Sequence, residues 1–252
     1  MFAKKSLGQN FLISEAPIRK MIEECNVSEK DTVLEIGPGK GILTKALLET
    51  GAKVIAVEKD DSLIPVLQAT FPKEIISGQL KLIHGDVLEL NIENILNSPY
   101  KLIANIPYYI TGEIIRKFLE SNLQPTCVAL LVQKEVAERI VAKDGKESIL
   151  SISVKVYGEP KYGGTVKKGL FRPIPNVDSA VIIINNISKD FFRNISEEKF
   201  FEIVKKGFSQ KRKQLKGTLG EIISIEKIEE AIGDATRRPE TLSKEEWEKL
   251  IT

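Results

Sequence analysis

Short apolar runs alternate with amphipathic stretches through the first 186 residues. Apolar runs bounded by turn residues predict strands at 32–36, 53–57, 80–84, 102–104, 127–132, 149–157 and 179–185. Apolar residues at helical spacing predict helices at 14–25, 43–48, 113–119 and 135–141. Strands that alternate with helices are typical of an α/β fold with a largely parallel sheet.

Beyond Asn186 the pattern is helical alone. The periodicity predicts helices at 197–208, 215–219, 225–232 and 244–250. A change from mixed to purely helical patterning marks a change of domain. The sequence therefore predicts an α/β domain over residues 1–186 and a small all-helical domain over residues 187–252.

Glycine or polar residues follow four successive predicted strands. They are the turn at 37–41 (GPGKG), then Glu58, Asp86 and Asn105. Because ligands of open α/β sheets bind outside the carboxyl ends of the strands, we expect these residues to line one site. Glu58 lies about twenty residues past the glycines, where a carboxylate accepts from ribose hydroxyls. Asp86 suits an adenine amino group. A surface glutamate and a helix N-cap are the simpler alternatives for these two residues.

The stretch Asn105-Ile106-Pro107-Tyr108 stands between a predicted strand and a predicted helix. Pro107 restricts the backbone and holds the carbonyls before it in place, while Asn105 adds a side-chain acceptor. Tyr108 adds a flat face for stacking. Two acceptors beside an aromatic ring suit a planar amino group such as that of adenine. An ordinary proline turn with a core tyrosine is the alternative, and the four residues alone do not decide between them.

The composition argues against a metal-binding, a membrane-spanning or a secreted protein. The 252 residues carry a net charge of +2, one histidine and two cysteines, which is too little for a histidine-based metal site. Cys25 and Cys127 have no metal or redox spacing and are expected to be small core residues. We expect no metal and no membrane span, and the N-terminus lacks the apolar region of a signal peptide. A cytoplasmic protein is expected.

A basic segment over residues 205–216 contains no acidic residue. Its six cations are Lys205, Lys206, Lys211, Arg212, Lys213 and Lys216. A solvated helix face is one interpretation, and contact with a phosphate backbone is the other. We take these residues as candidates for RNA binding.

Several motifs together resemble the rRNA adenine N6-dimethyltransferases. The motifs are Gln9-Asn10-Phe11-Leu12, the segment 35–41 (EIGPGKG), Glu58, Gly85-Asp86, Asn105-Ile106-Pro107-Tyr108 and the loop 171–179 (FRPIPNVDS). The segment 237–242 (RRPETL) is similar to a C-terminal signature of the branch that dimethylates two adjacent adenines near the 3′ end of 16S rRNA.

The resemblance implies a Rossmann-like methyltransferase fold, a seven-stranded mixed sheet that binds S-adenosylmethionine, and a helical C-terminal domain for RNA. It implies that 16S rRNA, within the 30S subunit or its precursor, is the partner of a monomeric enzyme of ribosome biogenesis. The cofactor residues would be Asn10, Leu12, Gly37, Gly39, Glu58, Asp86 and Asn105.

The same resemblance implies catalytic roles. Asn105 and the carbonyl of Ile106 would hold the target amino group, next to Pro107, and the rings of Tyr108 and Phe171 would sandwich the extruded base. Tyr109 stands where many relatives have asparagine.

Three alternatives remain open. An enzyme that methylates one adenine of 23S rRNA would share nearly every motif, so only the C-terminal helices argue against it. A ribosome-assembly or transcription factor with this fold would lack activity, and the intact Asn105, Pro107 and Tyr108 argue for an enzyme. A dehydrogenase is disfavoured because the third glycine has a different spacing from the dinucleotide motif and His84 is poorly placed for hydride relay.

Overall fold

The chain folds into two compact units. The computed structural model describes residues 9–96, 98–142, 145–210 and 212–251. The first unit comprises Met1–Ala137 with Pro160–Ile187, and the second comprises Glu138–Glu159 with Ser188–Thr252. The division after Ile187 lies one residue from the expected domain boundary. The segment Glu138–Glu159, expected in the first domain, groups with the C-terminal helices instead.

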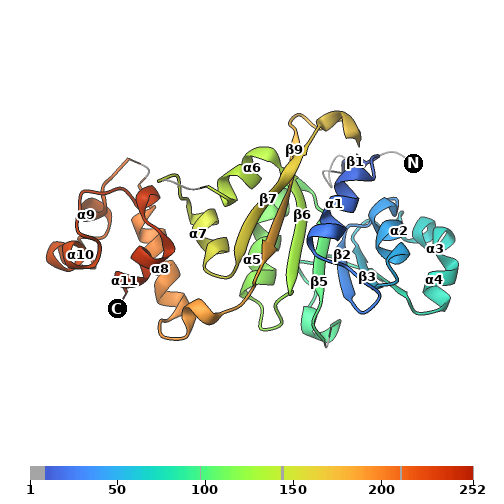
Figure 1. Cartoon of the computed structure of the whole chain (residues 1–252), viewed down its shortest axis with the longest axis horizontal. Coiled ribbons are helices and arrows are strands. Elements are labelled where there is room, and N and C mark those ends of the chain that lie inside the picture. The colour runs from blue at the N-terminus through green and yellow to red at the C-terminus, as the bar shows by residue number, and fades with distance from the viewer. Residues whose placement is uncertain (1–8, 97, 143–144, 211, 252) are drawn as a thin grey trace. The chain divides into compact units, whose positions relative to one another are not determined.

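A seven-stranded sheet forms the first unit (Figure 1). Its strands, in spatial order, are β4 (Leu80–His84), β3 (Lys53–Glu58), β2 (Thr32–Ile36), β5 (Lys101–Asn105), β6 (Cys127–Gln133), β9 (Ser179–Asn185) and β7 (Glu159–Val166). Strands β4 to β6 pair in parallel, and β9 runs antiparallel to β6. Two further strands, β1 (Phe11–Leu12) and β8 (Phe171–Arg172), form a separate antiparallel pair. The structure confirms the expected α/β fold with a mixed sheet.

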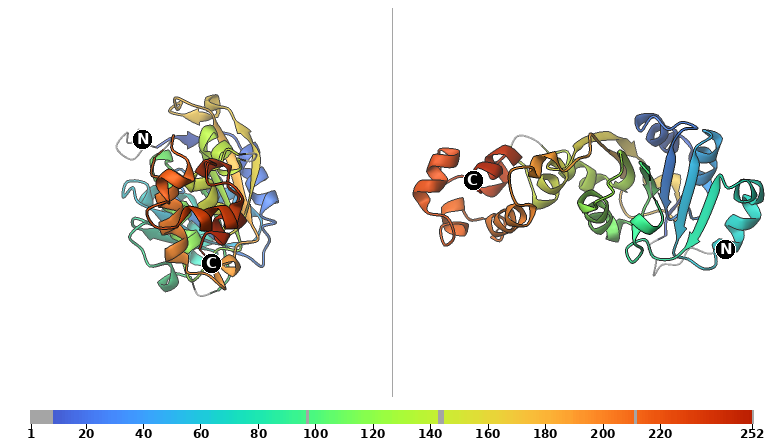
Figure 2. Two further views of the ribbon diagram at one scale, coloured as in Figure 1. Left: turned by 90° about the vertical axis from the view of Figure 1, so that its left-hand side faces the viewer. Right: turned by 90° about the horizontal axis from the view of Figure 1, so that it is seen from below.

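Helices cover both faces of this sheet, and Figure 2 shows them on either side of the strands. They are α1 (Ala16–Glu24), α2 (Ile42–Glu49), α3 (Ile64–Thr70), α4 (Pro72–Ile76) and α5 (Thr111–Glu120). The helix α6 (Lys134–Ile140) follows β6 and contains the boundary between the two units. Short 3-10 turns lie at Ile92–Asn94, Tyr108–Ile110 and Lys168–Leu170. From β2 the chain proceeds outward to β3 and β4, whereas from β5 it proceeds the other way to β6. Right-handed crossovers therefore place α2 and α5 on opposite faces.

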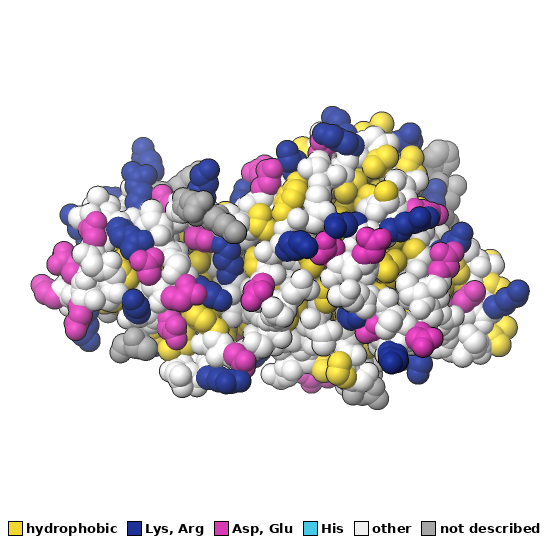
Figure 3. Space-filling view, viewed as in Figure 1, with side chains coloured by type: hydrophobic (Ala, Val, Ile, Leu, Met, Phe, Trp, Pro, Cys, Tyr) yellow, Lys and Arg dark blue, Asp and Glu magenta, His cyan; other side chains and the backbone are white. Residues whose placement is uncertain are grey.

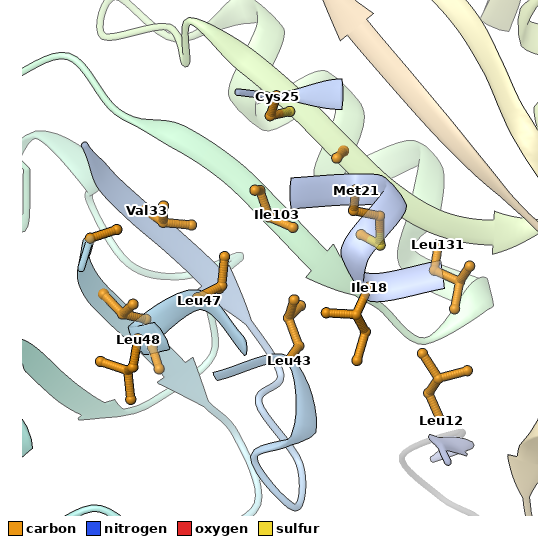
Figure 4. Close-up of a cluster of buried hydrophobic side chains, with 14 of the residues drawn as sticks. Leu12, Ile18, Met21, Cys25, Val33, Leu43, Leu47, Leu48, Ile103 and Leu131 are labelled. Atoms are coloured by element: carbon orange, nitrogen blue, oxygen red, sulfur yellow. The ribbon is translucent and has the colours of Figure 1, made fainter. Parts of the chain in front are cut away.

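The core beneath α1 and α2 is apolar throughout (Figure 4). Ile18 and Met21 of α1 and Leu43 and Leu47 of α2 are almost fully buried among strand residues such as Ile103. Alternate residues of the same strands point to the other face, and apart from Glu35 of β2 the buried residues of both sets are almost all apolar, as expected for a sheet covered on two sides. This two-sided core fixes the sheet edge that carries the functional residues.

The second unit is helical, as expected from the sequence. Its helices are α7 (Ile149–Lys155), α8 (Glu197–Gly207), α9 (Leu215–Thr218), α10 (Ile225–Ile232) and α11 (Lys244–Lys249), with 3-10 turns at Asp190–Phe192 and Pro239–Thr241. Arg237 binds Glu246 through two nitrogen–oxygen contacts of 2.5 and 3.0 Å and donates to the carbonyl of Thr241 at 2.7 Å. The segment 237–242 therefore holds α11 in place.

One predicted strand is wrong. The run 149–157 is largely the helix α7, which begins after Ser148. The side chains of Ser148 and Ser151 each accept the other's backbone N–H, so they satisfy donors at the start of the helix. Ile152 and Val154 are both fully buried. An apolar run that is buried on more than one side does not distinguish helix from strand by its periodicity.

Cys25 and Cys127 form a disulfide. Cys25 follows α1 and Cys127 opens β6, and both are buried as expected, at 3% and 4% exposure. The expectation of two separate core thiols is wrong, because α1 packs against β6 and brings together residues 102 positions apart. Sequence spacing carries no sign of such a pair.

Reduction of this disulfide is expected to lower the free energy of unfolding by about 2–4 kcal/mol, because the bond restricts a long loop of the unfolded chain. Thermal unfolding with and without a phosphine reductant measures the effect. The double variant Cys25→Ala, Cys127→Ala is the control and should be insensitive to reductant. Equal unfolding temperatures of the oxidised and reduced parent protein would contradict the prediction.

No helix among the described residues combines the length and the apolar character that crossing a bilayer requires.

Candidate functional site

A pocket lies at the carboxyl ends of β2, β3, β4 and β5. Its walls include the turn after β2, Glu58, Asp86, the segment after β5 and, from the N-terminal side, Asn10 and Leu12. Strands β2 and β5 are neighbours at the point where the strand order reverses. That is where ligands bind in doubly wound sheets. The structure therefore brings the four predicted strand ends together at one site.

The glycine-rich turn needs its glycines. Gly37, Gly39 and Gly41 all have positive φ, at 65°, 59° and 84°, a conformation that disfavours other residues. A Cβ on Gly39 would lie 3.1 Å from the ring of Phe11, and one on Gly41 would lie 2.6 Å from the ring of Phe71. The turn thus exposes backbone to the pocket on one side and packs tightly on the other.

Glu58 ties the turn to the next loop. One carboxylate oxygen accepts the N–H of Gly39 at 3.1 Å, and the other accepts the N–H of Asp60 at 2.7 Å. Burial raises the pKa of Glu58 above its ordinary value, and the two backbone donors oppose that shift. Asp60 in turn accepts from the side chain of Gln9 at 2.8 Å, so the N-terminal segment is held over the pocket.

Asp86 is an ionised acceptor at the pocket wall. Its Oδ2 lies 2.6 Å from the ammonium of Lys59, and its Oδ1 accepts the N–H of Leu88 at 2.9 Å. The Lys59 ammonium is the main cause that lowers the pKa of Asp86, against a smaller effect of burial. The helix N-cap alternative is not realised, because no helix begins directly after Asp86. The side chain accepts within a turn instead, and it also lines the pocket.

Glu35 is a site residue that the sequence reasoning missed. It is the penultimate residue of β2, lines the pocket and is 1% exposed. Neither carboxylate oxygen has a hydrogen-bond partner among the described residues. Burial raises the pKa of Glu35 to about 8, and the nearby Thr44 counteracts this only weakly, without a hydrogen bond of ordinary geometry. Its place in the segment 35–41 was the only signal, and a glutamate inside a strand reads as an interruption of the core.

Asn105 joins the pocket to the N-terminal segment. Its Nδ2 donates to the carbonyl oxygen of Asn10 at 3.3 Å, which leaves Oδ1 as an acceptor. Ile106 is 2% exposed, and Pro107 has φ −58° and ψ 133°, so the backbone here is extended and held in place. The geometry fits the predicted pair of acceptors.

Tyr108 is fixed at its hydroxyl. Its Oη lies 2.5 Å from the hydroxyl of Ser179, and its carbonyl accepts from Thr111 at 3.0 Å. Burial raises the pKa of Tyr108, so the phenol stays protonated at neutral pH. Its ring remains partly exposed and lines the pocket, as expected.

Phe171 is placed differently from the expectation. Its side chain is 0% exposed and packs in the core cluster with Leu12, Ile18 and Val181. It does not line the pocket. The pairing of β8 with β1 turns Phe171 into the core, so in this structure the two rings do not form a sandwich.

The basic residues belong to the second unit. Lys205, Arg212, Lys213 and Lys216 are exposed, and Lys206 pairs with Glu221 at 2.7 Å. Lys211 lies outside the described residues. Exposure is compatible with phosphate contact and equally with a solvated face. Within the described chain, no group of three or more His, Cys, Asp or Glu side chains could hold a metal ion.

The pocket fits S-adenosylmethionine, the cofactor implied by the resemblance. The orphaned Glu35 carboxylate matches an ammonium group, and the positive-φ glycines leave room for close approach of a ligand to the backbone. Glu58 has remaining lone pairs for ribose hydroxyls, and Asp86 has them for an adenine amino group. Asn10 and Leu12 close the site from the N-terminal side.

Comparisons with known proteins agree with this geometry. A profile of the family described as "Ribosomal RNA adenine dimethylase" matches residues 2–251. A "Ribosomal RNA small subunit methyltransferase A" of Dehalococcoides mccartyi is 43% identical, with 98% of this chain and 87% of that protein covered. The protein of the same name from Fusobacterium nucleatum is 41% identical, with 98% and 96% covered.

Solved structures share the fold at lower identity. A dimethyladenosine transferase from Plasmodium falciparum superposes with a TM-score of 0.81 at 24% identity, covering 95% of each chain. The 23S rRNA methyltransferase ErmE superposes with a TM-score of 0.79 at 23% identity, covering 96% of this chain and 98% of its own. The fold is therefore that of S-adenosylmethionine-dependent methyltransferases, and the nearly complete match of sequence gives the family. The chain belongs to the ribosomal RNA adenine dimethylase family.

Proposed function

We propose that this protein transfers methyl groups from S-adenosylmethionine to N6 of two adjacent adenines near the 3′ end of 16S rRNA. The observation that carries the proposal is the acceptor Oδ1 of Asn105, held beside Pro107 and Tyr108 at the edge of the pocket that contains Glu35 and Glu58. A planar amino group placed there meets two acceptors and a ring face.

The residues of the chain act mainly by positioning. Asn105 Oδ1 and the carbonyl of Ile106 accept hydrogen bonds from the two N–H groups of the target amine. These bonds favour a pyramidal nitrogen with a localised lone pair. Tyr108 stacks on the extruded base, held in place by Ser179. When bound, S-adenosylmethionine supplies an electrophilic methyl group. Holding the amine in near-attack geometry provides most of the acceleration.

No general base is required before attack. The nitrogen becomes strongly acidic once it is alkylated and releases its proton afterwards. The second transfer acts on a monomethyl amine with a single N–H, so one of the two acceptors, Asn105 Oδ1 or the carbonyl of Ile106, then faces a methyl group. The pocket must therefore tolerate the loss of one hydrogen bond.

The preference for the small subunit rests on sequence similarity. The relatives named small subunit methyltransferase A match 98% of this chain at 43% and 41% identity. The two solved structures differ in name but have nearly equal TM-scores, so the fold alone does not choose between 16S and 23S rRNA. We further propose that the enzyme is a cytoplasmic monomer acting on the 30S subunit or its precursor, and that Lys205, Arg212, Lys213 and Lys216 contact RNA phosphates.

Radiolabelled methyl transfer to undermethylated 30S subunits and, separately, to 23S rRNA tests the proposal. We expect dimethyladenosine at two neighbouring positions of the 16S 3′ region, located by mass spectrometry. Label confined to 23S rRNA would assign the chain to the other substrate. Absence of transfer to either RNA, with cofactor binding intact, would favour a factor that binds RNA without modifying it.

A further inference from the structure

The loop between β8 and β9 is anchored to the pocket at both ends. Before the loop, Phe171 and Arg172 pair with Leu12 and Phe11, two residues that line the pocket. After the loop, Ser179 lies 2.5 Å from the hydroxyl of Tyr108. Residues 173–178 therefore lie at the rim of the proposed base site.

The tip of this loop is apolar and exposed. Ile174, between Pro173 and the buried Pro175, is 58% exposed, and Val177 is 44% exposed. Ile13 is 51% exposed and lies beside the turn that leads into β8, because its N–H donates to the carbonyl of Leu170 at 2.9 Å. Single aliphatic side chains on a protein surface are ordinary, whereas several that are exposed close together at the rim of a pocket mark a candidate interaction surface.

The loop is held in a defined conformation. Asp178 accepts the N–H of Lys168 and the ammonium of Lys167, both at 2.9 Å, and its carbonyl accepts the N–H of Lys134 at 3.0 Å. Prolines on both sides of Ile174 restrict the backbone further. A stiff tip loses little conformational entropy when it inserts between other groups.

Cations surround the apolar tip. Arg172, Lys167 and Lys168 are exposed, and the Arg172 guanidinium is oriented by the carbonyls of Gly169 at 3.0 Å and Phe171 at 2.7 Å. The acidic Asp178 is already paired with Lys167, which leaves Arg172 and Lys168 for phosphates. Figure 3 shows apolar and basic side chains gathered over the part of the first unit that carries β1 in Figure 1. This combination fits a nucleic acid, with its phosphates on the cations and its base faces on the aliphatic tip.

Methylation of a stacked adenine also requires that something separate it from its neighbouring bases. An adenine that is stacked in RNA must leave its neighbours before its amine reaches Asn105, which costs a few kcal/mol. Phe171 is buried and does not offer a stacking face in this structure. Apolar wedges between neighbouring bases are a known way to unstack them.

We propose that Ile174, supported by Val177, is a wedge that inserts into the RNA stack beside the target adenine and lowers the barrier to its extrusion. The proposal rests on the proposed function, since it assumes an RNA adenine as the substrate. Arg172 and Lys168 bind the flanking phosphates. Ile174 thus distinguishes structured from unstructured RNA without touching the reacting atoms.

The test compares Ile174→Ser with the parent protein on two RNAs, a hairpin that stacks the target adenine and a short unstructured RNA of the same local sequence. We expect the variant to lose at least about tenfold in kcat/KM on the hairpin and little on the short RNA, since unstacking one base step costs more free energy than a tenfold change in rate represents. Ile174→Leu should restore activity on the hairpin. Ile76→Ser changes an isoleucine on α4 that is 86% exposed, and serves as the matched control.

A second readout follows extrusion directly. With 2-aminopurine at the target position of the hairpin, the parent should raise its fluorescence on binding and Ile174→Ser should raise it less. Equal losses on both RNAs, or no loss, would overturn the wedge. A loss on whole 30S subunits with none on the hairpin would overturn it in favour of a protein contact. Failure of the parent protein to methylate any RNA would instead refute the proposed function.

Discussion

Replacing Asn105 with alanine is expected to lower kcat for methyl transfer by about 100- to 1000-fold, comparable to the loss of one preorganised polar contact in other active sites. The variant loses the acceptor Oδ1 for the target amine and the 3.3 Å bond from Nδ2 to Asn10. Cofactor binding, measured by calorimetry, should weaken far less, because Glu35, Glu58 and Asp86 remain.

A second substitution at Asn105 separates loss of the acceptor Oδ1 from loss of the bond to Asn10, and a distant asparagine serves as the control. Asn105→Asp keeps an oxygen acceptor but loses the donor to Asn10, so it should retain more activity than the alanine variant if the acceptor matters. Asn122→Ala, at an exposed position after α5, is the matched control. Asn105→Ala activity within about tenfold of the parent would refute the assigned role, since a missing catalytic contact costs more than that.

Replacing Glu35 with glutamine is expected to weaken cofactor binding and to remove a pH dependence of stability. The pKa of Glu35 is raised from 4.5 to about 8 by burial. The folded protein thus retains a proton that the unfolded chain releases. Glu35 therefore does not lower the free energy of unfolding below the unfolded pKa of 4.5, and it lowers it progressively as the pH rises from there towards 8. At pH 7 the ionisation of Glu35 in the unfolded chain lowers the free energy of unfolding by about 3 kcal/mol.

Denaturant unfolding of the cofactor-free proteins between pH 5 and 8 measures this effect. The parent should lose stability across the range relative to Glu35→Gln, whose amide does not titrate. Glu49→Gln, at an exposed position of α2, should behave as the parent. Parallel curves for the parent and Glu35→Gln would contradict the raised pKa.

Cofactor binding should follow the opposite trend. Below pH 8 the Glu35 carboxyl must release its proton to pair with the cofactor ammonium, so affinity for S-adenosylmethionine should rise by up to about tenfold per pH unit. Calorimetry in buffers of different ionisation enthalpy counts the released proton. A Glu35→Gln variant with the same slope and the same affinity would show that another group binds the ammonium.

Much of the site followed from local patterns. Each strand of the parallel sheet contains a short apolar run. Glu58 and Asn105 are the last residues of β3 and β5, and Asp86 lies two residues beyond β4. The rule that parallel strands present their carboxyl ends at one edge was enough to bring these residues together. The glycines of the turn after β2 were a local signal as well, because glycine is the residue that most readily adopts the positive φ found at Gly37, Gly39 and Gly41.

Contacts between distant segments were not predictable in this way. The Cys25–Cys127 bond depends on how α1 packs on β6, and the burial of Phe171 depends on the pairing of β8 with β1. The helix α7 was mistaken for a strand because its apolar run is buried on more than one side. In each case the deciding neighbours lie far away in the chain.

The sequence by itself determined the alternation of strands and helices, the order of the residues along one sheet edge and the family. The tertiary structure alone decided which side chains reach the pocket. Glu35 lines it without a hydrogen-bond partner among the described residues, Phe171 does not line it, and Ile174 is exposed at its rim. The physical reason is that backbone conformation follows from neighbours along the chain, whereas burial and charge depend on segments that only folding brings together.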